Sequence, residues 1–449
     1  MSYIDSMTTV KLEPRDKVRS NTDSCGLRGK RAAMVTFSPY PGDPRPRRAI
    51  DTLVQEGMTV DLVCLGDGAS PRQETLKNVN VIRLPIENRR GGKLAYAYQY
   101  SAFILISSAI FALRSLVRRY DLVYVHNMPD ILVLSALVPK MLGAKVILDL
   151  HDPMPELMTT IFNLDKDSSS VRLISRLEKW SIGLADFVIT VNITCKRIFS
   201  SRSCRPEKIG VVMNSPDGAI FPFRAPRAHV LNGGSPNKAF TVMYHGSLVE
   251  RNGLDLAIEA LGRVQKIVPN VELRIYGQKT PFLERVMEAA QQKGVHDAIH
   301  YLGAKRLEEL VSEIDACDIG VIPNQRNAFT EINTPTRIFE YLALGKPVIA
   351  PNTTGIRDYF GKDSLLFFEP GNPENLADKI AYAFFHRAET TELVKQGQKV
   401  YREHSWPNER AQLVKFVSGL FGEGLSTVDC ATHTSRSVHS ATLPASPIE

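Results

Sequence analysis

Short, mostly apolar runs alternate with segments of helical periodicity along most of the chain. Thr59–Leu65 (TVDLVCL), Leu122–His126 (LVYVH) and Lys145–Leu150 (KVILDL) have the length and composition of strands. Runs that are apolar on both faces are typical of a parallel sheet that helices cover on both sides. The helical segment Pro129–Leu142 separates two of these runs. The pattern predicts an α/β fold with doubly wound parallel sheets.

The alternation occurs in two series, which predicts two domains. The first series also contains Ala32–Phe37, a helix from Pro46 to Gln55, and Asn80–Leu84. The strands expected after Arg224 are Phe240–His245, Val271–Tyr276, Ile299–Leu302, Ile319–Pro323 and Pro347–Ala350. The helices expected there are Leu254–Val264, Pro281–Lys293, Leu307–Ala316, Thr336–Leu344 and Pro373–Phe385. Because such sheets bind ligands at the carboxyl ends of their strands, facing domains would share a cleft.

Composition adds a class of partner. The formal net charge of +7 and the pI near 9.0 favour an anionic partner, namely a nucleotide, a phospholipid surface or nucleic acid. A mildly basic soluble protein is the alternative. No interleaving of basic and aromatic residues supports nucleic-acid binding. The six cysteines form no C-x-x-C pair, which argues against a zinc site and fits a reducing cytoplasm. The amino terminus shows no apolar stretch typical of a secretory signal.

The loop after the first expected strand argues against two common enzyme classes. Residues 38–45 (SPYPGDPR) do not form the G-x-G-x-x-G pattern, and the sequence contains no Walker A pattern. Neither a nicotinamide enzyme nor a P-loop ATPase is therefore expected. Asp43 and Arg45 lie on this loop and are candidates to line the cleft on the acceptor side.

A strand-to-helix turn in the second domain can bind phosphate. His245, Gly246, Ser247 and Leu248 follow a strand, and Arg251 precedes the next helix. A helix N-terminus carries unpaired amides and a partial positive charge, glycine permits close approach of the backbone, and arginine adds a forked cation. An ordinary turn with a surface arginine is the alternative.

A second helix start contributes a cation and a carboxylate. Pro335 can open the helix, and Thr334 or Thr336 can cap it. Arg337 and Glu340 are three residues apart and therefore share one helical face. A carboxylate beside a diphosphate site is suited to accept two ribose hydroxyls. A surface pair of Arg337 with Glu340 is the alternative.

These fragments together resemble a known family. HGSLVERNGLDLAIEAL, VELRIYGQ, LVSEIDACDIGVIPN, PTRIFEYLALGKPVIA and LLFFEPGNPENLADKI are ordered and spaced as in the donor domain of retaining glycosyltransferases of the GT-B fold, specifically glycosyltransferase family 4. FSPYPGDPRPRRAIDTLVQEGMTVDLVCLG, VYVHNMPD and VILDLHDPMPEL resemble the first domain of that family. The resemblance covers roughly residues 32–420. It implies a GT-B architecture of two facing Rossmann-like domains with a cleft between them.

The expected domain organisation follows from the composition and the resemblance. We expect a disordered segment over residues 1–29 and an acceptor domain over 30–220. We expect a nucleotide-sugar donor domain over 221–403, a helix over 404–424 that crosses back to the first domain, and a disordered tail over 425–449.

The resemblance also implies roles for individual residues of the donor domain. Glu340 matches the second Glu of the family's Glu-x7-Glu element and would bind the donor ribose. Arg337 and Arg251 would face the diphosphate and stabilise the leaving group, which makes them catalytic candidates.

The sequence departs from the family pattern at three positions. Ser247 and Asn252 stand where many members have Arg and Lys, and Ile332 stands where the first Glu of the element is expected. Residues at or near these positions are the remaining candidates for donor contacts. They are Gly246, Ser247, Glu331, Asn333 and Thr334.

Two histidines end strands of the first domain. His151 follows KVILDL, and the resemblance supports it as a residue that bonds the transferred sugar or assists at the reacting centre; a capping or structural histidine is the alternative. His126, at the end of LVYVH, and Asp130 close by are candidates for the acceptor side.

The implied activity is a hexosyltransferase-type transfer with retention at the anomeric carbon. A nucleoside-diphosphate sugar would be the donor, and a glycan or lipid-linked saccharide the acceptor, in polysaccharide or glycoconjugate biosynthesis. The resemblance implies no obligatory metal or other cofactor, and the sequence has no D-x-D element suited to a metal. Two alternatives remain: another GT-B enzyme, such as a sugar-nucleotide epimerase or a phosphorylase, and a catalytically silent GT-B binding subunit.

The segment Leu94–Arg119 bears on location. It is strongly apolar, is interrupted by serines, and has basic residues at both ends, among them Arg89, Arg90, Lys93, Arg114, Arg118 and Arg119. One interpretation is an interfacial helix on anionic lipid, which would place a cytoplasmic enzyme on the membrane surface. The other, which we favour for the apolar face, is a buried helix whose basic ends reach lipid.

Overall fold

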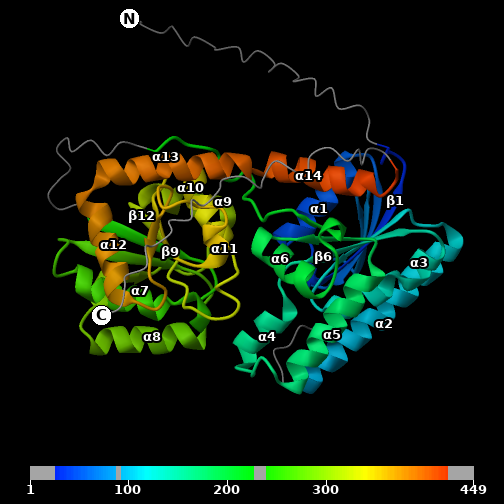
Figure 1. Ribbon diagram of the computed structural model, residues 1–449, viewed down its shortest axis with the longest axis horizontal. Coiled ribbons are helices and arrows are strands. Elements are labelled where there is room, and N and C mark those ends of the chain that lie inside the picture. Colours follow the sequence, from blue (N-terminus) through cyan, green and yellow to red (C-terminus); the bar gives the residue numbers. More distant parts are fainter. Residues whose placement is uncertain (1–25, 87–92, 227–238, 423–449) are drawn as a thin grey trace, which may run out of the picture.

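Two parallel sheets, each flanked by helices, form the two lobes of the computed structural model (Figure 1). The structure describes residues 26–86, 93–226 and 239–422, and only the backbone of residues 93–97. The expected disorder of 1–29 and 425–449 and the side chains of Arg89, Arg90 and Lys93 therefore lie wholly or largely outside the described residues.

The first sheet has the order β3-β4-β2-β1-β5-β6-β7-β8, and only β3 runs antiparallel to its neighbour. Its strands are β1 (Arg31–Pro39), β2 (Thr59–Leu65), β3 (Gln73–Leu76), β4 (Val79–Leu84), β5 (Leu122–His126), β6 (Lys145–Leu150), β7 (Phe187–Thr190) and β8 (Ile209–Val211). The helices around it are α1 (Pro44–Gln55), α2 (Lys93–Val117), η1 (Asp130–Ala136), α3 (Leu137–Met141), α4 (Met154–Phe162), α5 (Ser169–Leu184), α6 (Ile193–Arg202) and η2 (Pro206–Lys208).

The second sheet is parallel throughout and has the order β11-β10-β9-β12-β13-β14. Its strands are β9 (Phe240–His245), β10 (Val271–Tyr276), β11 (Ile299–Tyr301), β12 (Ile319–Val321), β13 (Val348–Pro351) and β14 (Leu366–Phe368). Its helices are η3 (Glu250–Asn252), α7 (Leu254–Val264), α8 (Pro281–Gln292), η4 (His296–Ala298), α9 (Leu307–Ala316), α10 (Thr336–Ala343), α11 (Thr354–Arg357), α12 (Pro373–Phe385) and α13 (Arg387–Glu403).

The strand order fixes where each sheet can bind a ligand. In the first sheet the chain moves outward from β1 to β2 and β4, then returns to β5 on the other side of β1. In the second sheet β9 and β12 are the corresponding neighbours. Loops that leave such a pair diverge over opposite faces and open a crevice at the carboxyl ends of the strands. The two crevices therefore open at the ends of β1 and β5 and of β9 and β12, and β6 lies next to β5.

Helix α14 (Trp406–Gly419) returns to the first domain (Figure 1). Leu413 and Val417 belong to the same apolar cluster as Leu53 and Val60 of the first domain. Arg410 of this helix bonds Glu56 at the end of α1. Because α13 packs on α10 of the second domain, α13 and α14 run across both lobes.

The structure confirms the expected long strands and most of the expected helices, but Pro129–Leu142 is a 3₁₀ turn followed by a short α-helix. Four short strands were not expected, and they lie at or next to a sheet edge: β3, β7, β8 and β14. Three or four residues are too few to show a period. Cys64, Cys195 and Cys317 are buried free thiols.

Candidate active site

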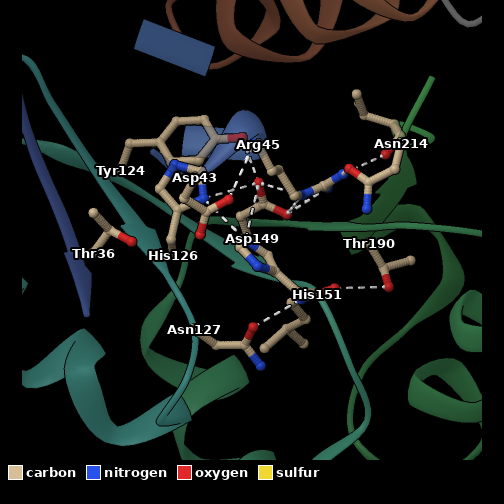
Figure 2. A network of polar contacts seen from close by, with 12 residues as sticks. Thr36, Asp43, Arg45, Tyr124, His126, Asn127, Asp149, His151, Thr190 and Asn214 are labelled. Carbon is tan, nitrogen blue, oxygen red and sulfur yellow. Dashed lines mark hydrogen bonds and ion pairs between the residues drawn. The ribbon is translucent and has the colours of Figure 1, made fainter. Parts of the chain in front are cut away.

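Asp149 is the centre of a buried polar network at the carboxyl end of β6 (Figure 2). Its carboxylate oxygens accept hydrogen bonds from Arg45 Nη2 at 2.6 Å and Arg45 Nε at 3.0 Å. The Tyr124 hydroxyl donates to Asp149 Oδ2 at 3.0 Å. Burial raises the pKa of Asp149, but Arg45 and the adjacent histidines more than offset this and hold it well below its usual range. Asp149 is therefore an ionised carboxylate.

The charge of Asp149 assigns the protons on two neighbouring histidines. Nδ1 of His126 lies 3.3 Å from Asp149 Oδ2 and 3.1 Å from Nε2 of His151. A carboxylate only accepts, so the proton of His126 is on Nδ1, and Nε2 of His151 accepts it as well. Burial lowers the pKa of His151 to about 3, so this ring is neutral and its own proton is on Nδ1. The His151 side chain is 20% exposed, which leaves that N–H accessible as a donor.

The same three side chains have the spacing of a metal site, with one ligand atom each within 4.8 Å of one another. The guanidinium of Arg45 already neutralises Asp149 from within hydrogen-bond distance. A second cation at this position would face a fixed positive charge. The charge balance therefore favours a proton network over a metal centre.

The residues expected on the acceptor side differ in how exposed they are. Arg45 does not line a cleft: it is 8% exposed, and it bonds the Val212 carbonyl in addition to Asp149. Asp130 is also buried, accepts from Asn127 Nδ2 at 2.9 Å, and burial raises its pKa to about 7. Both corrections have one cause: Arg45 belongs to helix α1 and Asp130 begins the helical turn η1, and each is buried where its element packs on the sheet. His126 is fully buried as well, whereas Asp43, the N-cap of α1, is partly exposed.

On the donor side, Gly246 and Arg337 lie against each other. Arg337 Nη1 donates to the His245 carbonyl at 2.7 Å, and its guanidinium carbon lies 4.9 Å from the centre of the Tyr244 ring. A Cβ on Gly246, whose φ is +128°, would lie 3.3 Å from this arginine. Glycine at this position therefore allows the α10 cation to rest on the end of β9.

Arg251 is on the η3 turn that follows β9. Its guanidinium carbon lies 5.9 Å from the centre of the Phe329 ring, and its carbonyl accepts from the Gln325 amide. Gly253 ends the turn at φ +68°, and a Cβ there would lie 1.9 Å from the Pro323 carbonyl oxygen. Gly253 thus allows the turn that carries Arg251 to pack on the loop after β12. Within the described residues no carboxylate lies within ion-pair distance of Arg251 or Arg337.

Glu340 does not pair with Arg337, so the alternative of a surface Arg–Glu pair is wrong. Its Oε2 atom lies 2.6 Å from Nε2 of His245, and the Glu340 side chain is 13% exposed. Across the described residues, its second oxygen has no hydrogen-bond partner. That oxygen is the atom available to a ligand.

The loop before α10 has its polar groups largely engaged. Glu331 accepts from the Thr354 amide at 3.0 Å and pairs with Arg326 at 3.2 Å, so it caps α11. Thr334 donates its hydroxyl to the Gly355 carbonyl at 2.7 Å. Asn333 of this loop is partly exposed. On the turn after β9, the side-chain amide of Asn252 donates to the Ser247 carbonyl. Ser247 itself is exposed beside the β9 end.

Charged groups of the two domains interact at the carboxyl ends of their strands. Burial raises the pKa of Asp152, which follows His151, to about 6, and the positive charge of Arg251 opposes that rise from the other domain. Burial and Arg45 lower the pKa of Arg48 to about 10, and the carboxylate of Glu340 is one of the charges that oppose this. The strand-end loops of the two sheets therefore face each other.

Asn192 connects the domains directly. Its Nδ2 atom donates to the Ile332 carbonyl at 2.9 Å and to Thr334 Oγ1 at 3.3 Å. Its Oδ1 atom accepts from the Cys195 amide and caps α6. One side chain thus holds both a helix start in the first domain and the donor loop of the second.

A cavity of about 130 Å³ lies elsewhere, at the opposite end of the second sheet. Asp315, Lys346 and Arg387 line it, together with Pro226, which is the last described residue before the gap at 227–238. It is remote from the strand ends that bear the candidate residues, and we do not assign it to the site.

Several of these residues were missed from the sequence. Asp149 and Asn192 were not predicted as site residues, and His245 was only a secondary candidate at its strand end. A charged residue within a buried strand, as in KVILDL, requires a partner and was a usable signal for Asp149. Asn192 and His245 act through residues more than ninety positions away, which no local pattern reveals.

Two family models match successive parts of the chain. The glycosyl transferase 4-like domain matches residues 43–215, and the glycosyl transferases group 1 model matches residues 231–400. The chain belongs to the GT-B glycosyltransferases of the group 1 type. In this glycosyltransferase, the first match contains the Asp149 network and the second contains Arg251, Arg337 and Glu340.

Curated relatives of the glycosyltransferase include a D-inositol 3-phosphate glycosyltransferase from Corynebacterium urealyticum, 25% identical over 42% of this chain and 45% of the relative. A GDP-mannose-dependent alpha-(1-6)-phosphatidylinositol monomannoside mannosyltransferase from Mycobacterium tuberculosis is 27% identical over 40% of this chain and 47% of the relative. The matched part of the chain thus spans about half the length of these relatives.

Solved structures share the fold of the glycosyltransferase. Sucrose-phosphate synthase from Thermosynechococcus elongatus superposes with a TM-score of 0.69 at 17% identity, over 88% of this chain and 100% of the other. HepE from Anabaena, solved with UDP, superposes with a TM-score of 0.62 at 17% identity, over 87% of this chain and 100% of the other. The GT-B fold is thereby established.

Proposed function

We propose that the protein transfers a sugar from a nucleoside-diphosphate sugar to a glycan or lipid-linked saccharide, with retention of the anomeric configuration, in polysaccharide or glycoconjugate biosynthesis. The observation that carries the proposal is the set of donor-side charges. Arg251 and Arg337 have no carboxylate partner among the described residues and lie at the β9–β12 switch point. Near them is Glu340, which has one carboxylate oxygen bonded to His245 and the other without a described partner. The pair of cations matches a diphosphate, and a carboxylate beside them matches ribose hydroxyls.

The reaction needs a bond to break at the anomeric carbon and a charge to be stabilised on the leaving phosphate. Arg251 and Arg337 would stabilise that charge. The acceptor oxygen would bond the anomeric carbon on the face that the phosphate leaves, and the acceptor proton would pass to the departing phosphate oxygen. His151, neutral and with an accessible Nδ1–H, would donate to a hydroxyl of the transferred sugar. No residue in this scheme requires a metal ion.

A thermal-shift screen of nucleoside diphosphates and their sugars tests the donor assignment. A ligand that binds only the folded protein raises the melting temperature. We expect one nucleotide to stabilise the wild type and Glu340→Ala or Arg337→Ala to remove most of that shift. Glu374→Ala is the matched control, since Glu374 is 69% exposed and belongs to α12. A shift that survives in Glu340→Ala would contradict the assignment.

Product analysis separates this function from the alternatives. A transferase releases the nucleoside diphosphate faster when acceptor is added, and the product keeps the donor's anomeric configuration. An epimerase would release it or isomerise the sugar without acceptor, and a silent subunit would bind the nucleotide without turnover. The mannosyltransferase relative makes phosphatidylinositol mannosides a reasonable first acceptor class to screen.

We also propose that the enzyme contacts an anionic membrane from its cytoplasmic face. Helix α2 buries one face, which includes Phe103 and Phe111, as expected. Its opposite face is also apolar but is exposed. Its exposed stripe contains Tyr98, Leu105, Leu113 and Leu116, between 66% and 76% exposed. The stretch Tyr98–Val117 has the length and hydropathy of a membrane span, and 28% of its apolar window is buried. Its packed aromatic face fits a helix that lies on a surface.

The neighbouring helix α5 adds charge to this surface. Both α2 and α5 contact η1, so they cover the same side of the first sheet. Arg172, Arg176 and Lys179 are exposed on α5 beside Leu173 and Trp180, whereas its acidic residue, Glu178, is buried on Arg202. A basic and apolar surface is suited to anionic headgroups.

Vesicle flotation tests this contact. The protein should float with vesicles that contain phosphatidylglycerol and not with pure phosphatidylcholine. A Leu105→Glu, Leu113→Glu, Leu116→Glu variant should lose flotation, since these positions are exposed and the fold does not need them. Ile267→Glu, at a 51% exposed position of the second domain, is the control. Flotation that persists in the triple variant would contradict the proposal.

A further inference from the structure

His245 makes two contacts that together require more protons than a neutral ring supplies. Its Nδ1 lies 2.9 Å from the Tyr341 hydroxyl, and its Nε2 lies 2.6 Å from Glu340 Oε2. The Tyr341 hydroxyl in turn lies 2.9 Å from the Met243 carbonyl oxygen, to which it donates. The chain of three contacts runs from β9 through α10 and back to β9.

The proton count decides the state of the histidine. The carbonyl of Met243 only accepts, and so does the carboxylate of Glu340, so each of the three contacts needs its own proton. A neutral imidazole and a tyrosine hold two. With two protons, one pair of lone-pair atoms would face each other at less than 3 Å in a buried position.

We infer that His245 is an imidazolium that positions the Glu340 carboxylate for the donor ribose, so that recognition of the ribose hydroxyls depends on this proton. The inference rests on the proposed function, which assigns Glu340 to the ribose. His245 is 4% exposed, which makes its partner Glu340 the required counter-ion. With Oε2 fixed on His245, Oε1 is directed to the ligand.

Charged and titratable groups surround the His245–Glu340 pair on the elements that pack against it. Arg337 of α10 contacts the His245 carbonyl, Tyr244 lies next to it on β9, and Tyr341 is its second partner. Cys317, just before β12, lies close enough to help raise the pKa of Tyr341. Arg48 of α1 lies close enough to Glu340 for their charges to interact. Apart from Glu340 no described carboxylate contacts His245, so loss of the imidazolium proton would chiefly release Glu340.

Nucleotide binding measured against pH tests the inference. Calorimetry would give the affinity of UDP and GDP, and of their 2′-deoxy analogues, from about pH 6 to pH 9. For the nucleotide that binds, the preference for ribose over deoxyribose should be roughly tenfold at the low end and should decline as the pH rises, because hydrogen bonds to a fixed carboxylate are of that strength. The deoxy analogue should show a much flatter profile.

His245→Gln keeps a hydrogen-bond donor beside Glu340 but cannot titrate. It should lower the ribose preference at pH 6 and remove its pH dependence. His296→Gln, at an exposed histidine on η4, should behave as the wild type. If nucleotide binds but the wild type and His245→Gln share one pH profile of ribose preference, the inference is wrong while the proposed function stands. If neither UDP nor GDP nor any other nucleoside diphosphate binds, the proposed function fails first.

A direct measurement does not depend on the variant's folding. In the wild type, nitrogen NMR of the histidine rings should show one buried ring with protons on both nitrogens at pH 6. The absence of any doubly protonated buried ring at pH 6 would overturn the inference.

Discussion

Nδ1 of His126 lies 3.1 Å from Nε2 of His151, at the ends of the neighbouring strands β5 and β6. This contact, with the ionised Asp149 behind it, leaves His151 with its single proton on the accessible Nδ1 atom. The first domain therefore presents a neutral hydrogen-bond donor, and the second domain presents cations.

Removal of the His151 donor should lower turnover with little effect on nucleotide binding. One donor aimed at charge or hydroxyl groups of a transition state contributes roughly 10²–10³-fold to the rate. We expect His151→Ala to lower kcat by about that factor. Because burial lowers the pKa of His151 to about 3, the ring should not titrate between about pH 5 and pH 9. Ring NMR that shows His151 gaining a proton near pH 6.5 would contradict the assignment.

Asp149→Asn should destabilise the first domain in a pH-dependent way. The substitution leaves Arg45 buried without its carboxylate, and loss of one partner of a buried pair costs about 3–5 kcal/mol. The pKa of Asp149 is depressed in the folded state, so its contribution is present above the unfolded value of about 4 and is lost as the pH falls below it.

Urea unfolding from about pH 7 down to pH 3 would measure this effect. The difference in free energy of unfolding between wild type and Asp149→Asn should be constant near neutral pH and should shrink in acid. Asp297→Asn, at a fully exposed residue of η4, serves as the control. A gap of the same size at both ends of the range would count against the ion pair.

Gly253→Ala should disrupt the turn that carries Arg251. Gly253 and Gly294 both have φ +68°, but a Cβ on Gly253 would lie 1.9 Å from the Pro323 carbonyl oxygen, whereas a Cβ on Gly294 meets nothing within 4 Å. Both alanine variants strain the backbone by about 1–2 kcal/mol, and only Gly253→Ala adds the clash. We expect Gly253→Ala alone to abolish the nucleotide-induced thermal shift. Equal behaviour of the two variants would show that the close approach is unimportant.

Asn192→Ala should weaken donor binding through the contact between the domains. It removes the cap of α6 and the hydrogen bond to the Ile332 carbonyl. Ser168→Ala removes a comparable cap from α5 without touching the second domain. Each cap is worth about 1 kcal/mol, so the two variants should lose similar stability. Only Asn192→Ala should raise the dissociation constant of the nucleotide measured by calorimetry; an equal rise in both would indicate a general loss of stability.

The sequence by itself determined the two-sheet α/β architecture, and its family resemblance supplied the donor-side candidates. Strand-length apolar runs such as LVYVH and VELRIY can only be buried between helices, and glycine and proline mark the turns at both candidate helix starts. These local properties fix the fold class, and the family resemblance then singles out Arg251, Arg337 and Glu340 as donor-side candidates.

Only the tertiary structure decided what each of these side chains contacts. The spacing of Arg337 and Glu340 was equally consistent with a surface pair, and the fold instead placed His245 against Glu340 and the His245 carbonyl against Arg337. Asp149, Arg45 and Asn192 likewise acquire their partners from positions more than one hundred residues away. Parallel sheets join strands through long crossovers, so the protonation and burial of a site at their ends depend on packing that local periodicity does not encode.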